Sequence, residues 1–175
     1  MNRNKVVLVD ENDQVLGEMD KMEAHVKGAL HRAFSIFLFN DKGETLIHQR
    51  AAHKYHGANL WTNTCCSHPQ WDEDVKLSAL ERLQHEMGMV CDIEFQFSFL
   101  YQAQVENDLI EHELDHVFIG NSNENPQINP DEVQDYKWIS LLDLKEDIEN
   151  NPLKYTFWFK KALPVLLEKM VKISD

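Results

Sequence analysis

The segment Trp61–Pro69, WTNTCCSHP, stands a few residues before a helical pattern that ends in Glu86-Met87-Gly88. Cys66 and His68 are two residues apart, so on an extended strand they project from the same side. A thiol beside an imidazole can serve as a nucleophile, as an acid–base pair or as part of a metal site. The loop before a helix can also raise the thiolate character of Cys66. Spacing alone leaves these roles open, and a buried, inert thiol is an equal alternative.

The composition is that of an ordinary globular domain. The chain has 175 residues, and we expect 1–175 to form a single domain. A net charge of −13 argues against a nucleic-acid partner, because phosphate binding needs a basic surface. No apolar run approaches the length of a membrane span, and the first residues do not resemble a secretory signal. Three cysteines, two of them adjacent, suit a reducing cytoplasm better than a disulfide framework.

Strand patterns and helix patterns are mixed along the chain. Runs rich in β-branched and aromatic residues predict strands at 6–9, 15–19, 33–39, 45–50, 95–103, 112–120 and 136–139. Helical spacing predicts helices at 21–27, 74–87, 142–149 and 155–171, the last strained by Pro164. The turn signal at 40–43 joins two strands into a hairpin. We therefore expect an α+β fold with helices against a mixed sheet.

Imidazoles and carboxylates form a possible metal-binding set. Glu111 and Glu113 alternate along a predicted strand and so share one face. His25 and His31 flank a helix end and a strand start, and His68 follows Cys66. Such side chains suit a divalent transition metal. Nothing in the spacing ties the histidines to the strand, so the residues alone favour a solvated strand edge with scattered surface histidines.

Three further features are open to a structural or a functional interpretation. Arg82 and Glu86 lie four residues apart on the predicted helix. They form either a surface ion pair or a cation beside a Mg²⁺ ligand. The cations Lys21, Arg50 and Lys54 are either exposed or gathered around an anion. The aromatic segment 155–159 is most often core. The face of Trp158 could also stabilise a cation, by about 2 kcal/mol when desolvated.

The segment 73–89 resembles the Nudix box, in which a glycine precedes spaced acids, an Arg-Glu pair, an acidic pair and a final glycine. Glu73 and Gly88 fit this pattern, and Ser67 stands at the opening glycine. Arg82 and His85 stand where a Nudix hydrolase carries metal-binding carboxylates. The resemblance implies the Nudix fold without the full hydrolytic metal site.

This pattern of losses resembles the type 1 isopentenyl-diphosphate delta-isomerases, which have the Nudix fold but do not hydrolyse their substrate. The most specific match is Trp-Thr-Asn-x-x-Cys-x-His-Pro at 61–69. One residue separates the cysteine and the histidine of the family, which selects Cys66 rather than Cys65. The other matching segments are Leu30–Ser35, Glu86–Gly88, Glu111–Glu113 and Trp158.

The resemblance implies that isopentenyl diphosphate and dimethylallyl diphosphate are interconverted in isoprenoid precursor synthesis. An unactivated alkene is protonated to a tertiary carbocation, and a neighbouring carbon then loses a proton. Cys66 and Glu113 would take the acid and base roles on opposite sides of the substrate. Tyr101 would hydrogen-bond to the acid, and Trp158 would face the cation.

The resemblance also implies two metal sites. A Mn²⁺ or Zn²⁺ ion would be held by His25, His31, His68, Glu111 and Glu113. The diphosphate would be bound by Mg²⁺ on Glu86 together with Lys21, Arg50, Lys54 and Arg82. The implied protein is a cytoplasmic enzyme, monomeric or weakly dimeric, that acts on a small isoprenoid diphosphate and has no nucleic-acid or membrane partner.

Two other functions compete with this one. A Nudix pyrophosphohydrolase would release phosphate or a nucleoside monophosphate, but it would require glutamates at positions 82 and 85. A non-catalytic domain would bind a diphosphate without converting it. The set of Cys66, Glu113, Tyr101 and Trp158 favours the isomerase.

Overall fold

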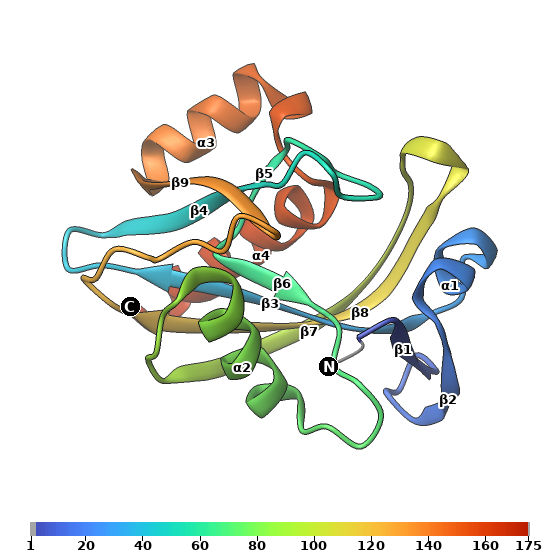
Figure 1. Ribbon diagram of the computed structural model, residues 1–175. Helices are drawn as coiled ribbons and strands as arrows, with labels where there is room; N and C mark the ends of the chain where they lie inside the picture. The colour runs from blue at the N-terminus through green and yellow to red at the C-terminus, as the bar shows by residue number, and fades with distance from the viewer. Residues whose placement is uncertain (1–2, 175) are drawn as a thin grey trace.

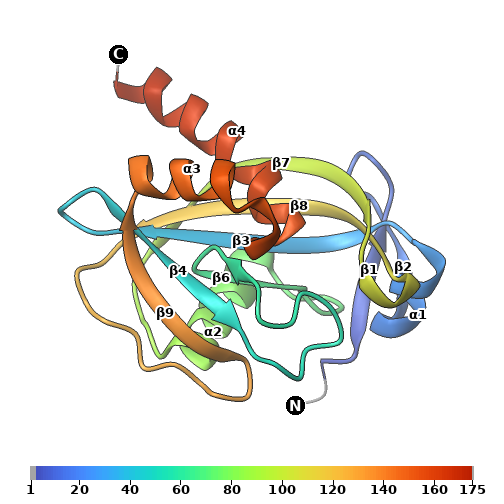
Figure 2. The same cartoon turned by 90° about the horizontal axis from the view of Figure 1, so that it is seen from above.

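A twisted mixed sheet forms the centre of the molecule (Figures 1 and 2). In the computed structural model, which describes residues 3–174, the sheet consists of β1 (Lys5–Val9), β2 (Val15–Asp20), β3 (His31–Phe39), β4 (Glu44–Arg50), β5 (Trp61–Thr62), β6 (Cys65–Ser67), β7 (Ile93–Gln104), β8 (Ile110–Asn121) and β9 (Val133–Ser140). The helices are α1 (Lys21–Lys27), α2 (Val75–Met87), α3 (Leu141–Asn150) and α4 (Phe157–Ser174). The α+β prediction is confirmed.

Strand β3 connects the parts of the sheet. It pairs in parallel with β8 along its whole length and antiparallel with β1, β4 and β6. The expected hairpin of β3 and β4 is paired at its tip, Phe39 with Thr45, after which β4 pairs with β5 and β9. The divergence of β4 leaves room for the short strand β6 along the middle of β3.

The central strand β3 is buried on both faces of the sheet. Phe34, Ile36 and Leu38 of β3 pack toward α2, whereas Phe37 and Phe39 belong to the opposite core with α4. Figures 1 and 2 show α2 on one side of the sheet and α3 and α4 on the other. The continuous apolar run of β3 is therefore that of a strand covered on both sides.

Local signals explain where α2 begins and ends. The carboxylate of Asp74 accepts a hydrogen bond from Leu77 N at 3.0 Å and caps the first turn. Gly88 ends the helix with φ of 63°, and a Cβ at this position would lie 2.7 Å from the carbonyl oxygen of Gln127. Glycine is thus required both for the left-handed backbone and for close approach of the 121–132 loop.

The expected start of α4 at 155 is wrong by two residues. Tyr155 instead forms an isolated bridge with Trp61, and Thr156 N donates to Trp61 O at 3.0 Å. These contacts hold the backbone extended until Phe157. The helix continues through Pro164, which lacks the N–H that would bond to the carbonyl four residues earlier. Among the described residues, no helix is long and apolar enough to cross a membrane.

Burial of His48 in β4 predicts acid sensitivity. Its side chain is 2% exposed, its Nδ1 lies 3.0 Å from Thr64 O, and burial together with the charge of Arg50 lowers its pKa to about 4. The unfolded chain binds a proton near pH 6.5, so stability falls as pH falls from about 6.5 toward 4. The full loss from this group is about 3 kcal/mol. Between pH 7 and pH 4.5, the free energy of unfolding measured with denaturant should fall less for His48→Gln than for the unsubstituted protein. An equal fall in both proteins would contradict the prediction.

Candidate active site

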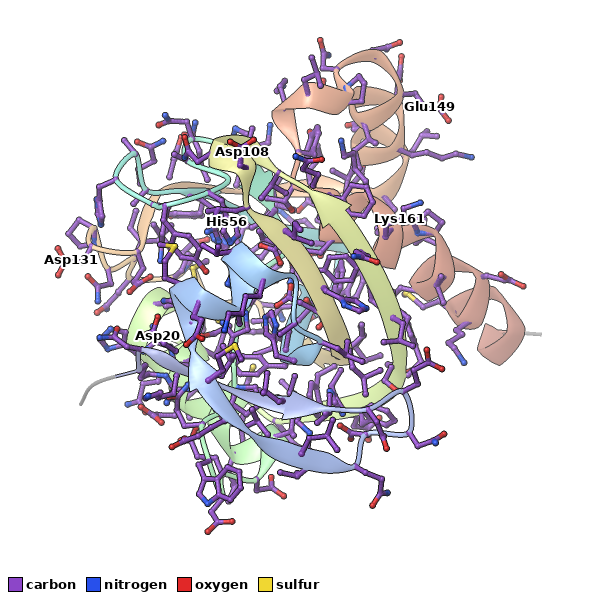
Figure 3. The ribbon with its side chains drawn as sticks, turned by 90° about the vertical axis from the view of Figure 1, so that its right-hand side faces the viewer. Asp20, His56, Asp108, Asp131, Glu149 and Lys161 are labelled. Carbon is purple, nitrogen blue, oxygen red and sulfur yellow. The ribbon has the colours of Figure 1, made fainter. Side chains whose placement is uncertain are left out.

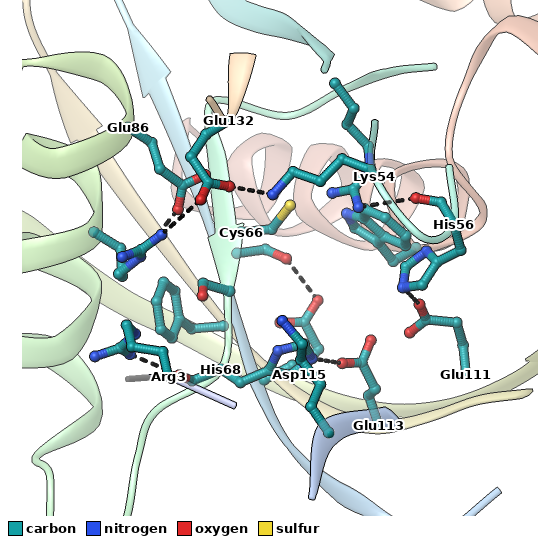
Figure 4. A pocket seen from close by; sticks show the side chains of 18 of the residues that line it. Arg3, Lys54, His56, Cys66, His68, Glu86, Glu111, Glu113, Asp115 and Glu132 are labelled. Atoms are coloured by element: carbon teal, nitrogen blue, oxygen red, sulfur yellow. Dashed lines mark hydrogen bonds and ion pairs between the residues drawn. The ribbon is translucent and has the colours of Figure 1, made fainter. Parts of the chain in front are cut away.

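A pocket of about 410 Å³ lies over β3, β6 and β8 (Figure 4). Most of the residues selected from the sequence line it: Lys21, Arg50, Lys54, Cys66, His68, Arg82, Glu86, Tyr101, Glu111, Glu113 and Trp158. His25 and His31 are completely buried and lie behind the wall of the pocket, against its glutamates. The structure thus brings together residues that are up to 137 positions apart in the chain, from Lys21 to Trp158.

Strand register determines which side chains meet. In β3, Ser35 is paired with Cys66 of β6, and His31 is paired with Glu113 of β8. Tyr101 of β7 is paired with the same Glu113 from the other side. The thiol and the carboxyl are therefore carried by two strands that share one neighbour.

The histidines and glutamates form a single buried cluster. Nε2 of His31 and Nε2 of His68 lie 3.2 and 2.7 Å from Oε2 of Glu113. Nε2 of His25 lies 3.6 Å from Oε1 of Glu111. The interpretation of these residues as scattered surface groups is wrong, because the turn after α1 brings His31 onto the strand beside β8.

The cluster fits a transition metal. Nδ1 of His25 and Nδ1 of His31 lie 2.7 and 2.9 Å from the backbone carbonyls of Lys21 and Ala29. Such carbonyl partners fix an imidazole so that Nε2 is the free ligand atom. Nε2 of His31 is buried without a hydrogen bond, and one ligand atom each from His25, His31 and His68 lies within 4.8 Å of the others. A divalent ion would satisfy these donors.

The surroundings of the Glu113 carboxyl raise its proton affinity. Burial and the charge of Glu111 raise its pKa, with His31 acting in the opposite direction. The hydroxyl of Tyr101 donates to Oε1 of Glu113 and lies 3.3 Å from Oε2 of Glu111. Burial raises the pKa of Tyr101 well above its usual value, so the phenol stays a hydrogen-bond donor.

Adjacent cysteines face opposite sides of the sheet. Cys65 is fully buried in the core beside α2, whereas Cys66 lines the pocket and packs against the α4 core. Burial raises the pKa of Cys66 to about 12, although the positive charge of Arg50 opposes this. The idea that its position raises thiolate character is therefore wrong. At neutral pH the group is an uncharged thiol, which carries a proton and is a poor nucleophile.

The other end of the pocket is cationic. Arg82 Nε lies 3.2 Å from Oε2 of Glu86, and Arg82 Nη2 lies 3.6 Å from Oε1 of Glu132. Lys54 also pairs with Glu132. Burial and the neighbouring Lys54 lower the pKa of Lys21, a sign of crowded positive charge. Such a cluster is suited to a phosphate group, and the buried oxygens of Glu86 are suited to Mg²⁺.

Trp158 joins the core to the pocket. Its side chain is mostly buried in the α4 core, and the guanidinium of Arg50 lies 5.1 Å from its ring centroid. The ring therefore already faces a cation, as expected for the electron-rich face of an indole.

Similarity to known proteins identifies the family. Residues 29–159 match the NUDIX domain. Isopentenyl-diphosphate Delta-isomerase 2 of Photorhabdus laumondii subsp. laumondii is 52% identical over 158 residues, covering 90% of this chain and 89% of that protein. The chain belongs to the isopentenyl-diphosphate delta-isomerase family. Isopentenyl-diphosphate Delta-isomerase 1 of Aromatoleum aromaticum is 47% identical, covering 91% and 90% of the two chains.

Solved structures with the same fold share less sequence identity with this member of the delta-isomerase family. DR0079 from Deinococcus radiodurans gives a TM-score of 0.68 at 19% identity, covering 84% of this chain and 90% of that one. The NUDIX domain of Shewanella oneidensis NrtR, complexed with ADP ribose, gives 0.61 at 19% identity, covering 81% and 87%. At this identity the likeness shows the Nudix fold and nothing about the substrate.

Sequence reasoning missed several residues that line the pocket, among them Glu132, His56 and Asp115. Glu132 ends the 121–132 loop, and His56 lies on the loop after β4. Asp115 accepts a hydrogen bond from the Ser35 hydroxyl at 2.7 Å, and burial raises its pKa. Alternation along β8 could have placed Asp115 on the same face as Glu111 and Glu113. Loop residues such as Glu132 and His56 carry no comparable signal.

Proposed function

We propose that the protein, as one domain, interconverts isopentenyl diphosphate and dimethylallyl diphosphate for isoprenoid precursor synthesis. The family membership supports this reaction class. The observation that carries the proposal is the placement in one pocket of two groups that can exchange a proton, the Cys66 thiol and the buried Glu113 carboxyl. Moving a double bond requires an acid and a base, and no nucleophile.

The proposed reaction begins with proton delivery to the alkene, which leaves a tertiary carbocation. One of Cys66 and Glu113 delivers this proton, and the other removes a proton from the neighbouring carbon, so the double bond moves and no atom is lost. Each positioned group contributes about 10²–10⁴-fold to the rate. The hydroxyl of Tyr101 holds the Glu113 carboxyl in place. The Trp158 face stabilises the cation, and the buried walls keep water from trapping it.

The cluster of His25, His31, His68, Glu111 and Glu113 would hold a Mn²⁺ or Zn²⁺ ion. This ion would supply a fixed positive charge that lowers the proton affinity of the adjacent carboxyl. Glu86 would hold Mg²⁺ at the other end, with the diphosphate also bound by Lys21, Arg50, Lys54 and Arg82. The local positive charge explains how a chain of net charge −13 can bind an anion. The cytoplasmic location and the monomeric or weakly dimeric state stay predictions.

Isotope incorporation tests the reaction. Incubation of the metal-loaded protein with isopentenyl diphosphate in D₂O should give dimethylallyl diphosphate that carries deuterium, detected by NMR or mass spectrometry. Protein treated with EDTA should give no product until Mg²⁺ and Mn²⁺ or Zn²⁺ are returned. Phosphate release from nucleoside diphosphate derivatives, without isomer formation, would instead support a pyrophosphohydrolase. Arg82 argues against that outcome, because it stands where a hydrolase needs a carboxylate and is itself paired with Glu86.

A further inference from the structure

The imidazole of His56 lies against the metal cluster although it is outside the set expected from the sequence. Its Nε2 is 2.6 Å from Oε1 of Glu111, and the two side chains are 5% and 1% exposed (Figure 4). One ligand atom each from His25, His56 and Glu111 lies within 4.8 Å of the others, so the two candidate metal groups of the described residues share His25. A buried contact of this length requires a hydrogen between the nitrogen and the oxygen.

The surroundings of the ring decide which nitrogen carries that hydrogen. Nδ1 of His56 is buried and has no hydrogen-bond partner among the described residues, whereas Nε2 faces a carboxylate. A hydrogen on Nδ1 would be buried without an acceptor and would cost roughly 1–3 kcal/mol. The hydrogen therefore sits on Nε2 and is donated to Glu111.

The loop that carries His56 is held in place by its own contacts. Arg50 Nη2 donates to His56 O at 3.0 Å. Gly57 has φ of 65°, and a Cβ there would lie 2.9 Å from Nε of Arg50. Gly57 N donates to the carboxylate of Glu106, near the tip of the β7–β8 hairpin that is marked by Asp108 in Figure 3. The ring is thus anchored to the same hairpin that carries Glu111.

Both oxygens of the Glu111 carboxylate have a polar neighbour. His56 contacts Oε1, and the hydroxyl of Tyr101 lies 3.3 Å from Oε2. We propose that His56 is a positioning residue of the metal centre, which donates a hydrogen bond from Nε2 to Glu111 and fixes this carboxylate beside Nε2 of His25. Partners of this kind typically change metal affinity by about 10–100-fold. The inference rests on the proposed metal site but not on the isomerase reaction.

Mn²⁺ affinity tests the proposal with a pair of variants of similar size. EDTA-treated protein is titrated with Mn²⁺, and free Mn²⁺ is measured by its EPR signal. His56→Leu, which has no donor, should bind about 10–100-fold more weakly, whereas His56→Gln, which keeps a donor, should stay within about threefold of the unsubstituted protein. The exposed His53 on the same loop provides the control, because His53→Ala should leave Mn²⁺ affinity unchanged. Thermal unfolding of the metal-free proteins establishes that each variant is folded.

Three results would overturn the proposal. Equal affinity of His56→Leu and the unsubstituted protein would show that the hydrogen bond has no effect on the metal. Equal losses in His56→Leu and His56→Gln would make His56 a direct ligand. Failure of the unsubstituted protein to bind Mn²⁺ and, in a parallel titration, Zn²⁺ would remove the metal site and the positioning role together. None of these results depends on turnover, so failure of the isomerase reaction is detected separately by the D₂O experiment.

Discussion

Cys66→Ala is expected to abolish turnover of isopentenyl diphosphate, whereas Cys65→Ala should retain most of it. Cys66 lines the pocket as an uncharged thiol, and its removal takes away one of the two groups that we propose for proton transfer. The expected loss is at least about 10²–10⁴-fold in kcat. Cys65 faces the α2 core, so its substitution should lower stability by about 1 kcal/mol with little effect on the reaction.

The two variants are compared by initial rates at saturating substrate and by thermal unfolding. The expected pattern is opposite for the adjacent residues: lost activity with near-normal stability for Cys66→Ala, and near-normal activity with reduced stability for Cys65→Ala. Equal activity of both variants would contradict the assignment of Cys66 as a proton-transfer group.

Glu113→Gln should lose turnover but still bind a diphosphate analogue. The amide keeps the size of the side chain but cannot exchange the proton, so kcat should fall by at least about 10²–10⁴-fold. The cations that would bind the diphosphate are unchanged, so the Kd of the analogue should change little.

Isothermal titration with the analogue and rate measurements separate these two effects. Glu86→Gln is the matched control, because it removes a carboxylate from the cationic end and should weaken analogue binding in the presence of Mg²⁺. Since Glu113 is also a proposed metal ligand, the metal content of each variant is measured alongside. Near-normal turnover of Glu113→Gln would remove Glu113 from the proton-transfer step.

Local signals in the sequence were enough to predict most helices and strands. Lys21–Lys27 forms the expected helix, with Asp20 as its N-cap and Gly28 at its end. The apolar run of β3 and the capped pattern of α2 are likewise near their expected bounds. Strand β6 was not predicted, because three residues, Cys65–Ser67, are too few to show alternation and are held by pairing with a distant strand.

The candidate site was predictable only in part. The WTNTCCSHP segment and the Glu111–Glu113 pair carry the resemblance to the delta-isomerases, and through it their residues can be selected from the sequence. The association of His25 and His31 with the glutamates depends on parallel pairing of β3 with β8, a long-range register that no local pattern specifies. Glu132 and His56 lie on irregular loops, where neither helical nor strand periodicity indicates the direction of a side chain.

The position of β3 between β6 and β8 has a consequence for how such a site can change during evolution. The spacing of the thiol and the carboxyl depends on the hydrogen-bonded register of three strands. Inserting one residue between His31 and Ser35 would turn one of the two active groups away from the pocket. The turn at 40–43, which carries no residue of the pocket, is free of this constraint. Changes in length should therefore accumulate there, while the spacing of the thiol and the carboxyl stays the same.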